Sequence, residues 1–253
     1  MILINKKNKY NLKIMDAWFV NNLDEIKEEY DILYLFGYKE CIKCCKNIKQ
    51  YSLLLDITKG EDEIFECIRK NVKYEINRCN KENVSFEVYK SNDIVESQKI
   101  LSDFECQYNE MYKEKNMNVK LSMREVNSYI ENNAFVLTAA KFDEKVLCYH
   151  AYVCDNKSTR LLYSCSNFRS DDHDMKNLIA RANKFLHWQD IKYFKQAGIH
   201  SYDFGGISSF EEPNGIDKFK MAFGGESVEY YNIKYVKTFK GKCYNIIRKI
   251  LHK

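Results

Sequence analysis

Three β-rich runs in close succession constrain the fold of this chain more than any other feature. They cover residues 134–140, 146–154 and 160–165, and each carries the β-branched, aromatic or aliphatic side chains that strands favour. The two polar segments between them, 141–145 and 155–159, have the length of hairpin loops. The pattern therefore predicts an antiparallel meander of three strands.

A helical run and further short elements follow the meander. A polar loop with helix-capping residues precedes a helix expected over about 175–197, which Gly198 would end. A strand over 201–204, a short helix over 215–222 and an aromatic strand over 228–236 come next. This combination indicates an α+β protein with a mixed, mostly antiparallel sheet flanked by helices.

The first half of the chain alternates strands and helices less regularly. The expected elements are strands over 32–36, 51–57 and 86–89 and helices over 62–80, 95–113 and 123–132. The first of these helices has the clearest apolar stripe, because its apolar residues recur every three or four positions. They are Phe65, Ile68, Val72, Ile76 and Cys79.

The opposite face of that helix is basic. Its charged residues are Arg69, Lys70, Lys73, Arg78 and Lys81. A solvated face on a surface helix is the ordinary interpretation of such a pattern. The functional alternative is contact with an anionic partner, such as RNA or a nucleotide-linked substrate, by neutralisation of phosphates.

Composition sets broad limits on organisation and location. With 253 residues, 45% of them hydrophobic, the chain can form one large or two small packed domains, and one proline with nine glycines leaves no flexible linker. A formal charge of +4 is compatible with an anionic substrate. No apolar run is long enough to span a membrane, and residues 1–13 do not resemble a secretory signal, so we expect a cytoplasmic protein.

Neither the cysteines nor the histidines predict a metal site. Cys41, Cys44 and Cys45 form a CxxCC cluster, but no second CxxC or histidine pair follows at zinc-finger spacing. Small apolar residues on a helix are the favoured interpretation of this cluster. His150, His173 and His187 are too scattered in the sequence to suggest a catalytic triad or a metal centre.

Two glycine-containing motifs near the end of the chain carry the functional signal. Residues 202–206 read YDFGG after an expected strand, and residues 215–225 read GIDKFKMAFGG before the last one. Together they resemble the C-terminal signature of the FemABX aminoacyltransferases, which are relatives of the GNAT N-acetyltransferases and build peptidoglycan cross-bridges. The resemblance covers most of the chain, although weakly before residue 130.

The resemblance implies a particular domain organisation. Members of that family have two GNAT-like halves and are longer than this chain. We therefore expect a truncated first GNAT-like half over residues 1–120 and a complete acyltransferase half over residues 121–253.

The resemblance also implies site residues. Lys220 matches the lysine at the family's reaction centre, with Phe219 beside it. An ammonium there could stabilise the oxyanion formed during acyl transfer, and Asp203 could accept the proton of the attacking amine. Substrate binding is expected from four residues around them: Arg169, Tyr202, Gly205 and Gly206.

The choice of acyl donor depends on the loop before the long helix. GNAT enzymes hold the pyrophosphate of coenzyme A with a glycine-rich turn, whereas residues 168–175 contain no glycine and three aspartates that would repel it. This loop favours the FemABX pattern, and the resemblance then implies aminoacyl-tRNA as the donor, without another cofactor, and an anionic cell-wall or polysaccharide precursor as the acceptor. Peripheral contact with a membrane surface would be compatible with such an acceptor.

Two alternatives stay open. The first is an acyl-CoA-dependent enzyme, with acetyl-CoA as donor, acting on an amino sugar in surface polysaccharide synthesis. The second is a binding protein that kept the fold and lost the reaction.

Overall fold

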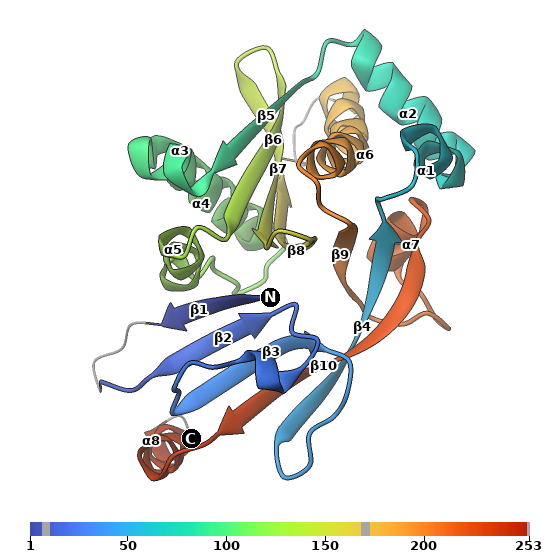
Figure 1. Cartoon of the computed structure of the whole chain (residues 1–253). Helices are drawn as coiled ribbons and strands as arrows, with labels where there is room; N and C mark the ends of the chain where they lie inside the picture. Colours follow the sequence, from blue (N-terminus) through green and yellow to red (C-terminus); the bar gives the residue numbers. More distant parts are fainter. Residues whose placement is uncertain (7–10, 168–172, 252–253) are drawn as a thin grey trace. The chain divides into compact units, whose positions relative to one another are not determined.

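The structure, a computed structural model, describes residues 1–6, 11–167 and 173–251 (Figure 1). The chain forms two compact units. Residues 1–52 and 228–253 make the terminal unit, and residues 53–227 make the central unit. The expected boundary between two GNAT-like halves at residue 120 stays a prediction, because compact units are defined by packing and not by resemblance.

Four strands form the sheet of the terminal unit. In spatial order they are β1 (Ile2–Lys6), β2 (Ile14–Trp18), β3 (Ile32–Tyr38) and β10 (Glu226–Val236). β2 runs parallel to β3, and the two outer pairs are antiparallel. Leu33, Leu35 and Ile233 on neighbouring strands pack into one buried apolar cluster, which holds the sheet against the short 3₁₀-helix at Leu23–Glu25.

The strands β1 and β2 and the last helix, α8 (Phe239–Leu251), were not anticipated from the sequence. β1 carries polar residues among its apolar ones, so its pattern alone is weak. α8 packs through Tyr244 against the buried cluster of Leu12, Ile14 and Ile32 in its own unit.

The central unit contains the predicted meander. Its strands, in spatial order, are β4 (Lys46–Asp56, which begins in the terminal unit), β9 (Ser201–Ile207), β8 (Ser158–Ser166), β7 (Lys145–Cys154), β6 (Phe135–Phe142) and β5 (Ser85–Lys90). Strands β5 to β8 are antiparallel, and β8 pairs with β9 in parallel. The expected α+β class with a mostly antiparallel sheet flanked by helices is confirmed.

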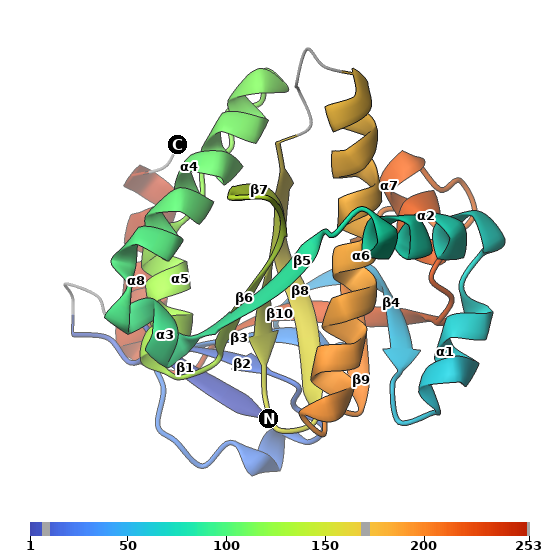
Figure 2. The ribbon, with the colours of Figure 1, turned by 90° about the horizontal axis from the view of Figure 1, so that it is seen from above.

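Helices cover both faces of this sheet. The long α6 (His173–Gln196) packs on β6 and β7 with α2 (Lys70–Lys81) beside it, and α4 (Gln98–Glu114) lies on the opposite side of the same strands (Figure 2). Two short helices, α3 (Ser91–Glu96) and α5 (Met123–Glu131), accompany α4. Leu147 on β7 and Leu178, Ala182 and Phe185 on α6 are among the buried residues between helix and sheet.

The helix expected over 62–80 is wrong as a single element. It is divided into α1 (Glu61–Cys67) and α2, because Ile68 is in an extended conformation. The backbone N–H of Arg69 donates to the carbonyl of Ala222 at 2.9 Å instead of continuing the helix. The apolar stripe was nevertheless assigned correctly, since Ile68, Val72 and Ile76 are buried.

The basic face of this region fits the ordinary interpretation. Lys73 pairs with Glu66 at 3.1 Å, and Arg78 pairs with Glu82 at 2.8 Å. Lys70 and Lys81 are exposed to solvent.

The CxxCC cluster is a turn and not part of a helix, which corrects the expectation. The side-chain amide of Asn47 donates to the carbonyls of Ile42 and Cys45 and accepts from the N–H of Ile42. These bonds hold a turn in which Cys44 has a φ of 62°.

Within the described parts of the chain, no helix combines the length and apolar character needed to cross a bilayer.

Candidate functional site

The two glycine motifs meet where β8 and β9 part. The parallel pairing of these strands covers only the first three residues of each, from Ser158 opposite Ser201 to Arg160 opposite Asp203. Gly205 and Gly206 therefore lie on β9 beyond this ladder. The helix α7 (Gly215–Met221), which carries Phe219 and Lys220, packs on β9.

A capping box fixes the start of α7. Oδ1 of Asn214 accepts from the N–H groups of Ile216 and Asp217, and the Asp217 carboxylate accepts from the N–H of Asn214 at 3.1 Å. Asp217 is buried and also accepts from the N–H and the hydroxyl of Ser208. Although burial opposes ionisation, the bonds from Ser208 and Asn214 lower the pKa of Asp217. This cap ties the helix to the end of β9.

Lys220 reaches from α7 back to the glycine motif. Its Nζ donates to the carbonyl oxygen of Gly206 at 2.8 Å, and its side chain is half-buried. Burial lowers the pKa of Lys220 to about 8, against the opposing effect of the Asp203 carboxylate and with the repulsion of Arg160 added. A cation with a lowered pKa thus lies against the carbonyl of Gly206 on β9.

The lowered pKa gives a test by stability. Because the unfolded chain keeps the Lys220 proton up to a higher pH than the folded chain, raising the pH from about 8 to about 10 should favour folding. We expect the melting temperature of the wild type to rise relative to that of Lys220→Met over this interval, and to stay parallel to it between about pH 6 and 7. Parallel curves throughout would contradict a lowered pKa at this position.

Gly205 has a steric role that Gly206 lacks. Gly205 has a φ of +77°, and a Cβ there would lie 2.8 Å from the carbonyl oxygen of Leu161 and 3.8 Å from Lys220 Nζ. A Cβ on Gly206 would meet no atom within 4 Å. The first glycine of the motif is therefore required for close approach of backbone segments.

This contrast predicts different effects of two similar substitutions. Gly205→Ala should cost about 1–3 kcal/mol of unfolding free energy from the backbone conformation, and more from the clash with Leu161. Gly206→Ala should change stability by less than about 0.5 kcal/mol. Urea denaturation of both variants measures the change in unfolding free energy. Equal losses of unfolding free energy in the two variants would refute the steric role assigned to Gly205. A loss of activity in Gly206→Ala alone would then support its predicted contact with substrate.

Asp203 forms a buried ion pair on the same strand. Its Oδ2 accepts from Nη1 of Arg160 at 2.6 Å, and its Oδ1 accepts from the N–H of Gly205 at 2.8 Å. The carboxylate therefore connects Arg160, its opposite residue in the last pair of the β8–β9 ladder, with the backbone of Gly205. Sequence reasoning identified Asp203 and missed Arg160, its partner.

Phe219 and Tyr202 connect this region to the core. The ring of Phe219 is half-buried and lies 5.5 Å from the ring of His187 and 5.6 Å from that of Phe223, between centroids. Tyr202 is fully buried, and its hydroxyl lies 2.8 Å from Nδ1 of His187. Its predicted role in substrate binding stays a prediction.

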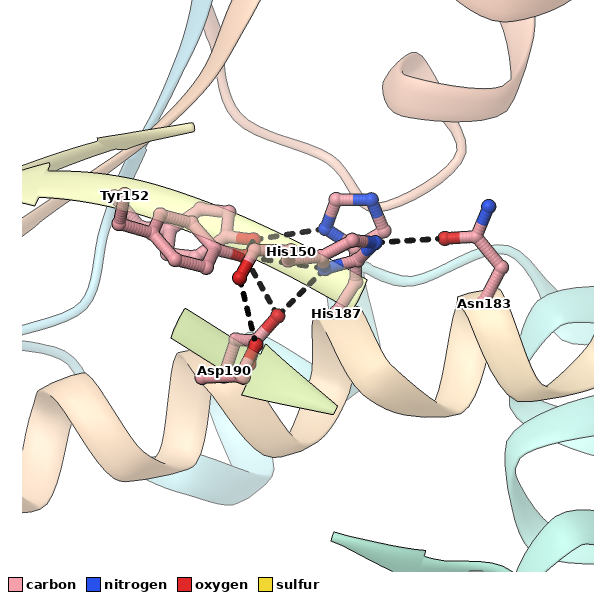
Figure 3. Close-up of polar contacts among 7 residues, drawn as sticks. His150, Tyr152, Asn183, His187 and Asp190 are labelled. Atoms are coloured by element: carbon pink, nitrogen blue, oxygen red, sulfur yellow. Dashed lines mark hydrogen bonds and ion pairs between the residues drawn. The ribbon is translucent and has the colours of Figure 1, made fainter. Parts of the chain in front are cut away.

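A chain of buried hydrogen bonds leads inward from His187 (Figure 3). Asp190 stands at its centre, because Oδ2 lies 2.7 Å from Nδ1 of His150 and accepts from the Tyr152 hydroxyl at 2.6 Å. The Tyr152 hydroxyl is also 2.6 Å from that of Tyr202, which continues to His187. At the other end, Nε2 of His150 lies 2.8 Å from Oδ1 of Asn183.

The direction of these bonds follows from the number of protons available. Tyr152 donates its single proton to Asp190, so Tyr202 must donate to Tyr152, and His187 must donate from Nδ1 to Tyr202. Burial, with smaller electrostatic effects of the neighbouring His150 and Lys220, lowers the pKa of His187 well below its usual value. His187 is therefore a neutral imidazole with its lone pair on Nε2.

This network corrects the expectation that the histidines are scattered. The rings of His150 and His187 lie 4.2 Å apart, and both are fully buried with Asp190, with potential ligand atoms within 4.8 Å of one another. The signal for it was present, because Asn183, His187 and Asp190 have the spacing of one helical face. Polar residues on the apolar face of a helix require partners there.

The other predicted site residue, Arg169, lies outside the described residues, as does most of the loop used to choose a donor. Among the described residues, a cavity of about 570 Å³ opens at the amino end of α6. Its lining includes Asp174, Arg78 and Arg181. Glu82 holds both arginines, at 2.8 Å for Arg78 and 2.9 Å for Arg181.

Comparison with family models decides the relationship of this chain to known proteins. The model of the FemAB family matches residues 89–249, which include the whole region of Lys220 and the buried network. The chain belongs to the FemAB family. It is accordingly an acyltransferase, as the sequence motifs predicted. Comparison with curated protein sequences gives no match.

Solved structures share the fold of this FemAB protein at low identity. FemX has a TM-score of 0.58 and 13% identity, with 78% of this chain and 63% of that chain covered. A DUF2156 C-terminal domain assigned to a lysylphosphatidylglycerol synthetase from Agrobacterium fabrum has a TM-score of 0.55 and 11% identity, covering 87% and 72%. L-PGS from Bacillus licheniformis has a TM-score of 0.53 and 10% identity, again covering 87% and 72%.

Proposed function

We propose that this FemAB protein transfers an aminoacyl group from aminoacyl-tRNA to an amine of a peptidoglycan or other cell-envelope precursor. The observation that carries the proposal is the position of Lys220, a half-buried cation held at the carbonyl of Gly206 in the motif by which the chain resembles its family. The similarity in fold to FemX and to L-PGS supports the same class of reaction. A cytoplasmic location, where charged tRNA is available, is part of this proposal.

The reaction joins the acceptor amine to the ester carbonyl of the charged tRNA. A new C–N bond forms, the C–O bond to the terminal ribose breaks, and the proton lost by the amine ends on the ribose hydroxyl. The carbonyl oxygen carries a negative charge in the tetrahedral intermediate, and in our proposal the ammonium of Lys220 stabilises it. With a pKa of about 8, Lys220 is mostly charged at neutral pH and could also return a proton to the leaving oxygen.

The remaining predicted residues take supporting roles in this proposal. Phe219 packs between His187 and Phe223 and so orients the turn of α7 that bears Lys220. Asp203 would accept the amine proton only if its bonds to Arg160 and Gly205 loosen, so its contribution to positioning Gly205 is the simpler role. Gly206 and Arg169 are proposed to line the path of the substrates, whereas the fully buried Tyr202 would act on it only through its contact with His187.

Labelled aminoacyl-tRNA tests this proposal directly. The purified chain should move label from the RNA to a precursor peptide with a free lysine amine, and should not do so when that amine is acetylated. Label that stays on the RNA with every such acceptor would refute the reaction.

The alternatives predict other results in the same preparation. Thermal stabilisation by coenzyme A but not by charged tRNA would favour an acyl-CoA-dependent enzyme acting on an amino sugar. Lys220→Ala that leaves every measurable activity intact would favour a binding protein.

A further inference from the structure

The carboxyl-terminal helix α8 exposes an unusual amount of apolar surface. Phe239 is 81% exposed, Ile250 68%, Ile246 59% and Ile247 54%. Large apolar side chains exposed singly are ordinary, but four on one helix of thirteen residues form a patch that needs an explanation.

These residues lie on one side of the helix. Phe239, Cys243, Ile246 and Ile250 follow one another at intervals of four, three and four, which places them in a single stripe. The other side of the helix faces its own unit. Tyr244 packs against the buried cluster that contains Ile32, and a Cβ on Gly241 would lie 2.7 Å from the carbonyl oxygen of Asp31. This close approach leaves the stripe directed away from the core that α8 covers.

The charged residues of α8 itself are all basic. Lys240 and Lys242 are exposed and lie one residue to either side of Gly241, so they fall on the two flanks of the stripe. No aspartate or glutamate follows Glu229 in the sequence, while seven lysines and arginines do. An apolar stripe bordered by lysines fits a partner that has an apolar interior and a negatively charged surface.

We propose that α8 docks the protein on an anionic membrane surface. Phe239, Ile246 and Ile250 would enter the boundary between headgroups and acyl chains, and the flanking lysines would remain at the level of the lipid phosphates. The mixed requirement for apolar burial and for negative charge distinguishes this partner from a neutral protein surface. The inference concerns an interaction surface and does not depend on the reaction proposed above.

Flotation of the full chain with lipid vesicles tests this. Vesicles with about 30% phosphatidylglycerol should carry the protein upward, vesicles of phosphatidylcholine alone should bind at least about tenfold less, and about 0.5 M NaCl should weaken the binding. The double substitution Ile246→Ser with Ile250→Ser should reduce binding to the anionic vesicles about tenfold or more. Lys242→Glu should reduce it less, and only at low salt.

A matched control and a second measurement make the outcome decisive. Val95→Ser removes an apolar side chain that is 60% exposed on α3, and should leave vesicle binding unchanged. Light scattering of the same variants shows whether the stripe instead pairs two copies of the chain. No binding of the wild type to anionic vesicles, binding unaffected by the double substitution, or a dimer that the substitution dissociates without changing vesicle binding would each overturn the proposal.

Discussion

Lys220→Ala is expected to lower turnover by about 10²- to 10³-fold while the melting temperature stays close to that of the wild type. Loss of one charge-stabilising donor at an acyl-transfer centre has an effect of this size. The stability of the fold should not fall, because burial lowers the pKa of Lys220. This means that folding disfavours the charged form of its side chain. Single-turnover transfer from labelled aminoacyl-tRNA measures the rate, and differential scanning calorimetry measures the melting temperature.

A lysine on the same helix serves as the control. Lys218 is exposed on α7, two residues from Lys220, and Lys218→Ala removes the same charge from the same short helix. Its turnover should fall by less than about threefold, because the charge is screened by solvent. Similar losses in the two variants would mean that the overall basic charge of α7 matters and that Lys220 has no special place. A large fall in the melting temperature of Lys220→Ala would mean that it is a structural residue.

Asp190→Ala is expected to destabilise the protein by about 3–5 kcal/mol. The substitution removes the acceptor of the Tyr152 hydroxyl and the partner of His150 Nδ1, in a region closed to water. For a chain of this size the melting temperature should fall by roughly 6–20 °C. Asp190→Asn retains an acceptor oxygen of similar shape and should recover part of the loss.

An aspartate nearer the start of α6 provides the comparison. Asp174 is exposed near the amino end of this helix, and Asp174→Ala should cost less than about 1 kcal/mol. Equal losses at positions 174 and 190 would show that the chain of hydrogen bonds from His150 to His187 contributes nothing particular to stability.

Local patterns in the sequence predicted the meander because it depends on neighbours along the chain, whereas the role of Lys220, which was assigned from the resemblance of its motif to the family, stays a prediction. The strands at 134–165 alternate with polar hairpins, and Lys220 stands in a motif with its own helix cap at Asn214. Such features are visible without knowing which segments meet in space.

The features that were missed depend on distant partners. α1 and α2 are separate because Arg69 donates to Ala222 across the fold. His150 and Asp190 are 40 residues apart and on different kinds of element, so their pairing requires knowing that β7 faces α6. The turn at Cys44 results from the side chain of Asn47, whose bonds no apolar pattern reveals.

The terminal unit contains both the first and the last strands of the chain, with the whole central unit between them in the sequence. Ile32 on β3 pairs with Val236 on β10, so a growing polypeptide exposes this edge of β3 until β10 has been synthesised. The contiguous central unit emerges earlier and can begin to form during synthesis. The terminal unit, including α8, can therefore be completed only after the central unit has been synthesised, and a product that stalls before β10 would keep an unpaired strand open to aggregation.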